Sequence, residues 1–257
     1  MHIFFGLLVV LAVNALPFWG VFGWKLDPAQ LLVLFWVENA ANTVLISARI
    51  LIHRRLSRKR GHWDVPANFT VLVNGKVTRA ATTRGSALVA FLVPSGIFTL
   101  AHGAFVVILA QWMLPEGASL FSDEIRLGIE ALLAAMLLGF VSDLVGIRER
   151  PFAWIRHIYE MALGRVVAIQ LLIFGGIFTM AVVGDSQIVL VAILALKLLA
   201  DLGSALPPAK TREKPPWYSR FLGRLRPSFD EAWIRQHREE VAAHARDEEI
   251  WEDRRRG

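Results

Sequence analysis

SALVAFLVPSGIFTLAHGAFVVILAQWML, residues 86–114, runs for 29 residues without an Asp, Glu, Lys or Arg. A helix rises about 1.5 Å per residue, so about twenty apolar residues cross the roughly 30 Å hydrocarbon core of a bilayer. A helix in a soluble core is usually shorter and carries a polar face. We therefore predict a transmembrane helix here. Because it is long, we expect it to tilt, to kink at Pro94 or to protrude.

The rest of the chain repeats this pattern, with 55% hydrophobic residues and only 19% charged ones. Spans must be helical, because an unpaired backbone group in lipid is too costly and there is no barrel-like alternation. The first span could be a signal peptide cleaved after Ala15, but it lacks a basic start and its apolar run continues, so we expect it to be retained. We predict an all-α, polytopic membrane bundle of six spans: 3–22, 29–53, 86–114, 125–145, 165–184 and 187–206.

The charged loops alternate in sign along the chain. Segment 54–85 carries eight Lys or Arg residues, segment 115–124 carries three acids and no base, and the tail beyond 206 carries twelve Lys or Arg residues. The positive-inside rule therefore places 54–85, 146–164 and both termini in the cytoplasm. The net charge of +6 follows from bases that flank apolar spans, which indicates anionic lipid headgroups as partners and not nucleic acid.

Two parts lie outside the predicted membrane domain, which covers 1–206. Within the cytoplasmic loop 54–85, an alternating run on both sides of Asn74-Gly75 predicts a β-hairpin. A lone hairpin is marginally stable, so we expect it to rest on the bundle or on headgroups. We interpret it as a connector, with a lid as the alternative.

The tail, 207–257, is predicted to be helical and charged. It opens with Pro207-Pro208, which ends the last span. Aromatic and basic residues then interleave, as in a helix lying at the headgroups, with Trp217, Arg220 and Arg224 as contacts. We expect the stretch 229–255 to be solvated, with a protein partner at the tail as the alternative.

Ionisable residues inside the predicted spans are the candidate functional residues, because each costs about 2.5–3.5 kcal/mol in hydrocarbon and normally faces protein or water. Their depths predict two layers, each balanced in charge. A midplane layer would contain Glu38, Asn39, Asn42, His102 and Lys197. A cytoplasmic layer would contain Arg49, Asp143, Arg165 and Asp201. For Arg49 and Arg165, near the span ends, we expect snorkelling toward the surface.

Searches for known catalytic motifs exclude several classes. The chain has no cysteine, no phosphate-binding or dinucleotide-binding glycine loop, no His-Glu-x-x-His and no Gly-x-Ser-x-Gly, and no second histidine within the membrane could pair with Ser95. His102 is the one histidine expected at mid-depth, and zinc needs three or four ligands, so we predict no metal site. We expect His102 to bond Glu38 or to relay a proton. No cofactor follows from the sequence.

The chain resembles an uncharacterised family of prokaryotic multi-pass membrane proteins, classed as a domain of unknown function. The resemblance spans roughly residues 1–206, with the hairpin and the tail outside it. Four places carry it: Phe35–Asn39, Ile97–Gly103, Gly164-Arg165 with Gly175-Gly176, and Leu196–Asp201. The resemblance implies an inner (cytoplasmic) membrane and singles out Glu38, Asn39, His102, Arg165, Lys197 and Asp201. Members look to carry further histidines, near Pro94-Ser95 and near Ser204-Ala205 here, so a metal held by them would be absent from this chain.

Three hypotheses about function follow. The first is binding or transport of a small polar or anionic ligand, or a proton, in a polar intramembrane cavity. Lys197 and Arg165 would take the negative group, Glu38 and His102 the proton, while Asn39 and Asn42 orient the ligand. The second is an intramembrane enzyme, metal-assisted in one form, with Glu38 or His102 as acid or base. The third is an accessory or scaffold subunit with structural ion pairs.

Overall fold

The structure is a computed structural model that describes most of the chain. It describes residues 2–24, 26, 28–67, 70–73, 76–79, 83–113, 119–120, 122–183, 191, 194–199, 201–202 and 241–251. For several of these it describes the backbone alone: 2–7, 66–67, 70–73, 76–79, 83–84, 110, 112–113, 168–174 and 176–183.

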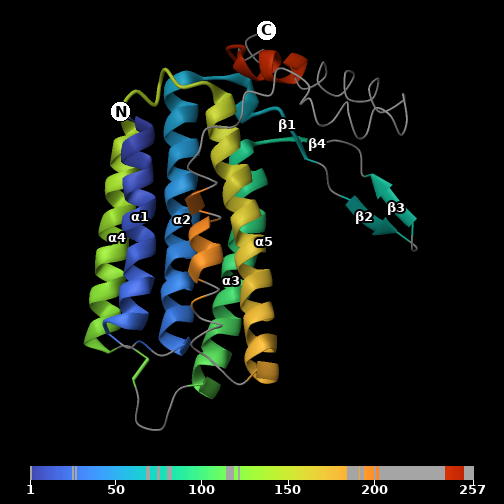
Figure 1. Ribbon diagram of the computed structural model, residues 1–257. Coiled ribbons are helices and arrows are strands. Elements are labelled where there is room, and N and C mark those ends of the chain that lie inside the picture. Colours follow the sequence, from blue (N-terminus) through green and yellow to red (C-terminus); the bar gives the residue numbers. More distant parts are fainter. Residues whose placement is uncertain are drawn as a thin grey trace, which may run out of the picture.

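Among the described residues, five long helices form most of the bundle (Figure 1): α1 (His2–Phe22), α2 (Pro28–Ser57), α3 (Ala87–Met113), α4 (Asp123–Leu144) and α5 (Phe152–Val183). Helix α2 is central and contacts each of the other four. Helices α1 and α4 lie side by side on one flank of α2, and α3 and α5 lie on the other. The first four predicted spans agree with α1 to α4 to within four residues at each end.

The fifth predicted span, 165–184, begins too late. Helix α5 already starts at Phe152, so the predicted loop 146–164 shrinks to a short connection that ends at Pro151. Polar residues in the first turns of α5 interrupt the apolar run on which the prediction rested. They are compatible with a helix because Phe152, Ile155 and Tyr159, three and four residues apart, bury one face of it.

Three of the described helices are long and apolar enough to cross a membrane: Pro28–Ser57, Ala87–Leu109 and Asp123–Leu144. Leu8–Phe22 is a shorter apolar helix. Of the predicted sixth span, 187–206, the structure describes residues 191, 194–199 and 201–202, which are helical, and the rest lies outside the described residues. The structure therefore supports a helical bundle with at least three candidate spans, and the count of six stays a prediction.

The bundle exposes apolar side chains and buries polar ones. On α3, Leu100 is 75% exposed and Ile108 is 65% exposed, whereas Thr99 and His102 are buried. Water disfavours an apolar face of this kind, but lipid tails do not. The arrangement fits helices that turn their outer faces to a bilayer.

Two apolar clusters hold the helices together. One joins α1, α2 and α4 through Val13, Leu26, Leu31, Leu34, Ile125, Leu132 and Met136. The other lies at the end of the bundle where α2 ends, and it joins α2, α3 and α5 through Ile46, Ile50, Val65, Ala87, Phe91, Phe152, Ile155 and Tyr159.

The segment between α2 and α3 begins with the short helix η1 (Arg60–His62) and forms two antiparallel strand pairs. The inner pair is β1 (Val65–Ala67) with β4 (Thr83–Gly85). The outer pair is β2 (Thr70–Val73) with β3 (Lys76–Arg79), in which Val73 lies opposite Lys76. This register confirms the predicted hairpin, although Asn74-Gly75 lies outside the described residues. Figure 1 shows the outer pair extending to the side of the bundle and not resting on it.

Residues 241–248 form a helix at the end of the bundle where α2 ends and α5 begins (Figure 1). We expected the stretch 229–255 to be solvated, and most of its described residues are exposed. Asp247 is buried, however, and Glu249 and Trp251 bond the loop after α2, so the end of this segment docks on the bundle. The predicted headgroup contacts Trp217, Arg220 and Arg224 lie outside the described residues. Helix α1 also begins at this end of the bundle.

Candidate functional site

Four charged side chains from three segments meet inside the bundle: Glu38, Arg165, Lys197 and Asp201, here called the buried charge cluster. Lys197 Nζ lies 3.1 Å from Glu38 Oε2 and 2.7 Å from Asp201 Oδ2. Arg165 Nη1 lies 3.3 Å from Glu38 Oε1 and 3.0 Å from Asp201 Oδ1. Each acid therefore faces both bases, and each base faces both acids. This mutual pairing is what makes burial of four charges tolerable.

The burial is deep for three of the four side chains. Glu38, Lys197 and Asp201 expose only 2% of their side chains, and Arg165 exposes 16%. Lys197 also lies over the ring of Phe35, with Nζ 5.8 Å from the ring centroid. Arg165 is thus the member of the cluster that still reaches toward open space.

Asn14 of α1 completes the polar contacts of the cluster. Its Nδ2 donates to Asp201 Oδ2 at 3.0 Å and to the Val10 carbonyl at 2.9 Å, and its Oδ1 accepts from Lys197 Nζ at 3.0 Å. The sequence analysis missed this residue. The available signal was a single amide in an otherwise apolar span, which is also typical of an ordinary contact between helices.

The two predicted layers are not separate. Arg165 and Asp201, predicted for the cytoplasmic layer, join Glu38 and Lys197 of the midplane layer in one cluster. Because α5 begins at Phe152, Arg165 lies thirteen residues into the helix, about 20 Å from its start. The expectation that Arg165 snorkels from a span end is therefore wrong.

A second ion pair lies nearer the end of the bundle at which α4 stops. Asp143 Oδ2 lies 3.0 Å from Arg49 Nη2, and Asp143 Oδ1 lies 3.3 Å from Arg150 Nη1. Arg49 also packs its guanidinium over Phe140, 5.1 Å from the ring centroid. Arg49 and Asp143 thus form the part of the predicted cytoplasmic layer that stays together.

Asn39 belongs to the contact between α2 and α3. Its Nδ2 donates to Thr99 Oγ1 at 2.9 Å, and Trp36 Nε1 donates to the Thr99 carbonyl at 2.9 Å. Gly103 makes this approach feasible, since a Cβ there would lie 2.6 Å from Trp36 Nε1. Asn39 therefore joins two helices, and its predicted role in orienting a ligand gains no support from these bonds.

His102 is buried, with 5% exposure, in an aromatic setting on its own helix. Its ring stacks on Phe98 at 5.6 Å between centroids and lies 6.4 Å from the ring of Phe105. The predicted hydrogen bond to Glu38 stays a prediction. Among the described residues, no three His, Asp or Glu side chains gather to hold a metal ion.

A polar pocket of about 210 Å³ lies between α2, α4 and α5. Apolar side chains of α2 and α5 form part of its wall. Its polar lining comes from five side chains: Asn42, Arg49, Asp143, His157 and Arg165. Arg165 thus faces the pocket and pairs with the buried charge cluster at the same time.

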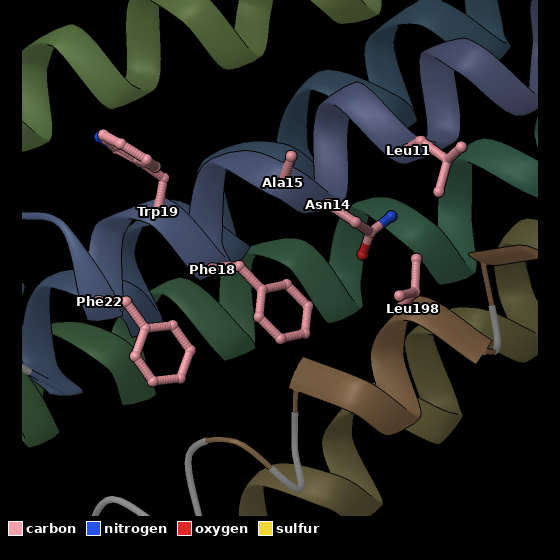
Figure 2. Close-up of a pocket in the computed structure, with 7 residues that line it drawn as sticks. All are labelled: Leu11, Asn14, Ala15, Phe18, Trp19, Phe22 and Leu198. Carbon is pink, nitrogen blue, oxygen red and sulfur yellow. The ribbon is translucent and has the colours of Figure 1, made fainter.

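A larger groove of about 460 Å³ follows α1 and is almost wholly apolar. Figure 2 shows Phe18 and Phe22 along one side, Leu198 on the neighbouring helix, and the amide of Asn14 turned toward that helix. The amide of Asn14 already bonds Asp201 and Lys197, so the groove offers a ligand an almost wholly apolar surface.

The model of a protein family of unknown function matches residues 3–241 of this chain. No curated protein and no solved structure matches it. The matched range contains the β-hairpin segment and much of the tail, so the expectation that both lie outside the resemblance is wrong.

Proposed function

The chain belongs to the family of unknown function DUF6498, and we propose from its geometry that it is a multi-pass membrane protein that binds a small anionic ligand in the polar pocket. The observation that carries this proposal is the double position of Arg165. Its guanidinium holds Glu38 and Asp201, and its side chain also lines a pocket that a small molecule can enter.

The lining of the pocket suits an anion. Arg49 and Arg165 supply two cations against the single carboxylate of Asp143, so the wall carries a net positive charge. Guanidinium groups bind carboxylate and phosphate oxygens through paired hydrogen bonds. Asn42 adds an amide that can donate to the same ligand, and His157 lies on the opposite wall.

Binding at Arg165 also disturbs the cluster beneath it. A ligand anion that takes part of the Arg165 guanidinium leaves Glu38 and Asp201 with Lys197 as their full counter-charge. A proton taken up by one carboxylate restores the balance. The geometry therefore supports anion binding coupled to proton uptake, which is the chemistry that proton-linked transport requires.

The test uses purified protein in mild detergent, with acetate, succinate and inorganic phosphate as probes at constant ionic strength. We expect at least one probe to raise the unfolding temperature, because a ligand at 100 times its Kd stabilises the folded state by about 2.7 kcal/mol. Asn42→Leu should abolish the shift, because it replaces the amide donor with an apolar side chain of similar shape. Val44→Leu, two residues away on the exposed face of α2, should keep it.

Proton coupling is measured on the same samples. Titration in two buffers of different ionisation enthalpy should show proton uptake with the ligand. The proposal fails if no probe stabilises the protein, or if Asn42→Leu responds like Val44→Leu. Binding without proton uptake would support the anion-binding pocket but contradict the proposed coupling to a proton.

The scaffold alternative draws on a specific observation of its own. The cluster is fully paired and three of its four side chains are almost inaccessible, as in a structural core. In that case Glu38→Gln combined with Lys197→Gln should lower stability but leave any anion response and its proton count unchanged. The enzyme alternative gains less support, since neither Glu38 nor His102 is among the described residues that line the pocket.

A further inference from the structure

Three consecutive acids of the C-terminal segment, Asp247, Glu248 and Glu249, dock on the end of the bundle. They are here called the acidic clasp. Glu248 Oε2 lies 2.5 Å from Lys59 Nζ, and Glu249 Oε2 lies 3.0 Å from Arg60 Nη1. Asp247 pairs with Arg156 of α5. The three bases, Lys59, Arg60 and Arg156, are here called the basic seat.

Backbone contacts fix the register of the docked segment. Arg60 N donates to the Glu249 carbonyl at 2.7 Å, and Trp251 N donates to the Arg58 carbonyl at 2.8 Å. The rings of Trp63 and Trp251 stack with centroids 5.7 Å apart and an interplanar angle of 20°. Because these contacts are directional, the segment binds in one defined position and is not held by a diffuse attraction between unlike charges alone.

A backbone N–H group lies beside the basic seat and also binds the clasp. Glu248 Oε1 accepts from Ala153 N at 3.2 Å, at the start of α5. The first N–H groups of a helix have no partner within it and favour an anion. Glu248 thus binds an ammonium group and a helix start together, which is the set of donors that a phosphate oxygen also uses.

Docking of the clasp can be reversed, because two of its three ion pairs are partly exposed to solvent. Glu248 is 31% exposed and Glu249 56% exposed, so both pairs are partly solvated and are screened by salt. Another anion at high local density can therefore displace them. If α2 crosses the membrane and ends at Ser57, Lys59 and Arg60 follow directly at the bilayer surface.

We propose that the basic seat binds the headgroups of anionic lipids, and that the acidic clasp occupies the same seat when such lipids are scarce. An anionic leaflet presents many phosphates within a Debye length of the seat. Lipid binding then releases residues 241–251 from the bundle. This inference depends on the membrane placement of α2 and not on the proposed anion pocket.

The absence of cysteine makes a single spin label simple to place. Ala245→Cys lies on an exposed position of the docked helix and outside the clasp. The labelled full chain is compared in nanodiscs of phosphatidylcholine alone and of phosphatidylcholine mixed with phosphatidylglycerol. We expect the ratio of released to docked label to rise about tenfold with the anionic lipid, as loss of the two partly exposed ion pairs of Glu248 and Glu249 implies.

Matched variants assign the effect to the clasp. Asp247→Asn with Glu248→Gln and Glu249→Gln should release the label in both kinds of nanodisc. Glu252→Gln with Asp253→Asn removes two acids that follow the clasp in the sequence and should behave like the parent chain. Native mass spectrometry supplies a second readout: the neutralised clasp should retain more phosphatidylglycerol, and Lys59→Gln with Arg60→Gln and Arg156→Gln should retain less.

Three outcomes would overturn the proposal. The label could stay equally docked with and without phosphatidylglycerol. Inorganic phosphate added to neutral nanodiscs at matched ionic strength could release it as well as lipid does, which would identify the seat as a site for free phosphate. The parent, the clasp variant and the seat variant could also retain equal amounts of phosphatidylglycerol. That result would show that the basic seat is not a headgroup site, whatever the spin label reports.

Discussion

At the scale of single residues, the charge cluster depends on an uncharged side chain. Asn14 is 3% exposed and places one donor on Asp201 and one acceptor on Lys197. A buried polar group that loses its partner costs about 1–3 kcal/mol. The amide therefore stabilises the fold by giving Asp201 and Lys197 one further hydrogen bond each.

Asn14→Leu should lower the free energy of unfolding by about 1–3 kcal/mol, since it leaves Asp201 and Lys197 each one hydrogen bond short. Thermal unfolding in detergent measures the change. Leu8→Ala, on an exposed position of the same helix, should shift it by no more than about 0.5 kcal/mol. An Asn14→Leu protein as stable as the parent would mean that the amide contacts contribute little.

Much of the candidate site is predictable from residue type and depth. Glu38, Lys197 and Asp201 are ionisable groups in apolar runs, and cost alone indicates that they must pair. Asn14 is not predictable in this way, because an amide in a span carries no comparable penalty. The partners of Arg165 could not be inferred either, since its depth depends on where α5 begins.

At the scale of elements, the seam between α2 and α3 depends on one missing side chain. Trp36 reaches the backbone of α3 only because Gly103 leaves room for its indole. Gly96 lies on the same helix and a Cβ there would meet nothing within 4 Å. The two glycines are thus a matched pair, one in a close contact and one in open space.

Gly103→Ala should destabilise the protein by about 1–3 kcal/mol, because the new Cβ overlaps the indole of Trp36. Gly96→Ala should be neutral or should stabilise by up to about 1 kcal/mol, because alanine is the better helix former. Chemical or thermal unfolding of both variants provides the comparison. Equal effects at the two positions would show that the seam accommodates the methyl group.

Element boundaries are well predicted where apolar runs end abruptly, as for α3 and α4. They fail for α5, in which charged and apolar residues share the first turns. The strands β1 and β4 also escaped prediction, because each has three residues and β1 contains Pro66. Their pairing follows from the chain returning to the bundle and not from a local pattern.

At the scale of the whole molecule, a histidine pair joins the end of α2 to the start of α5. His53 Nδ1 lies 2.7 Å from His62 Nε2, and His53 Nε2 lies 3.0 Å from the Arg150 carbonyl. The ring of His62 packs edge-on against Phe152. Burial, together with the nearby His53, Arg54 and Lys59, lowers the pKa of His62 to about 3.

This lowered pKa makes stability depend on pH. Below about pH 6.5 His62 binds a proton in the unfolded chain but not in the folded chain. The free energy of unfolding therefore falls as the pH falls toward 3. Between pH 6.5 and 5 the loss from this group is at most about 2 kcal/mol. Above pH 6.5 its contribution is complete and constant.

His62→Gln should flatten that dependence, and His244→Gln, at an exposed position, should not. Thermal unfolding of the three proteins from pH 5 to pH 8 measures the slopes. A His62→Gln slope equal to that of the parent would place the sensitivity on other groups.

The charged residues of the buried charge cluster are synthesised at different times. Glu38 and Lys197 are separated by 159 residues, so at translation rates of about 5–20 residues per second the acid precedes its base by on the order of ten seconds. Arg165 and Asp201 also follow late. If the chain is inserted as it is synthesised, Glu38 passes this interval without its basic partners, either protonated or sheltered by the insertion machinery.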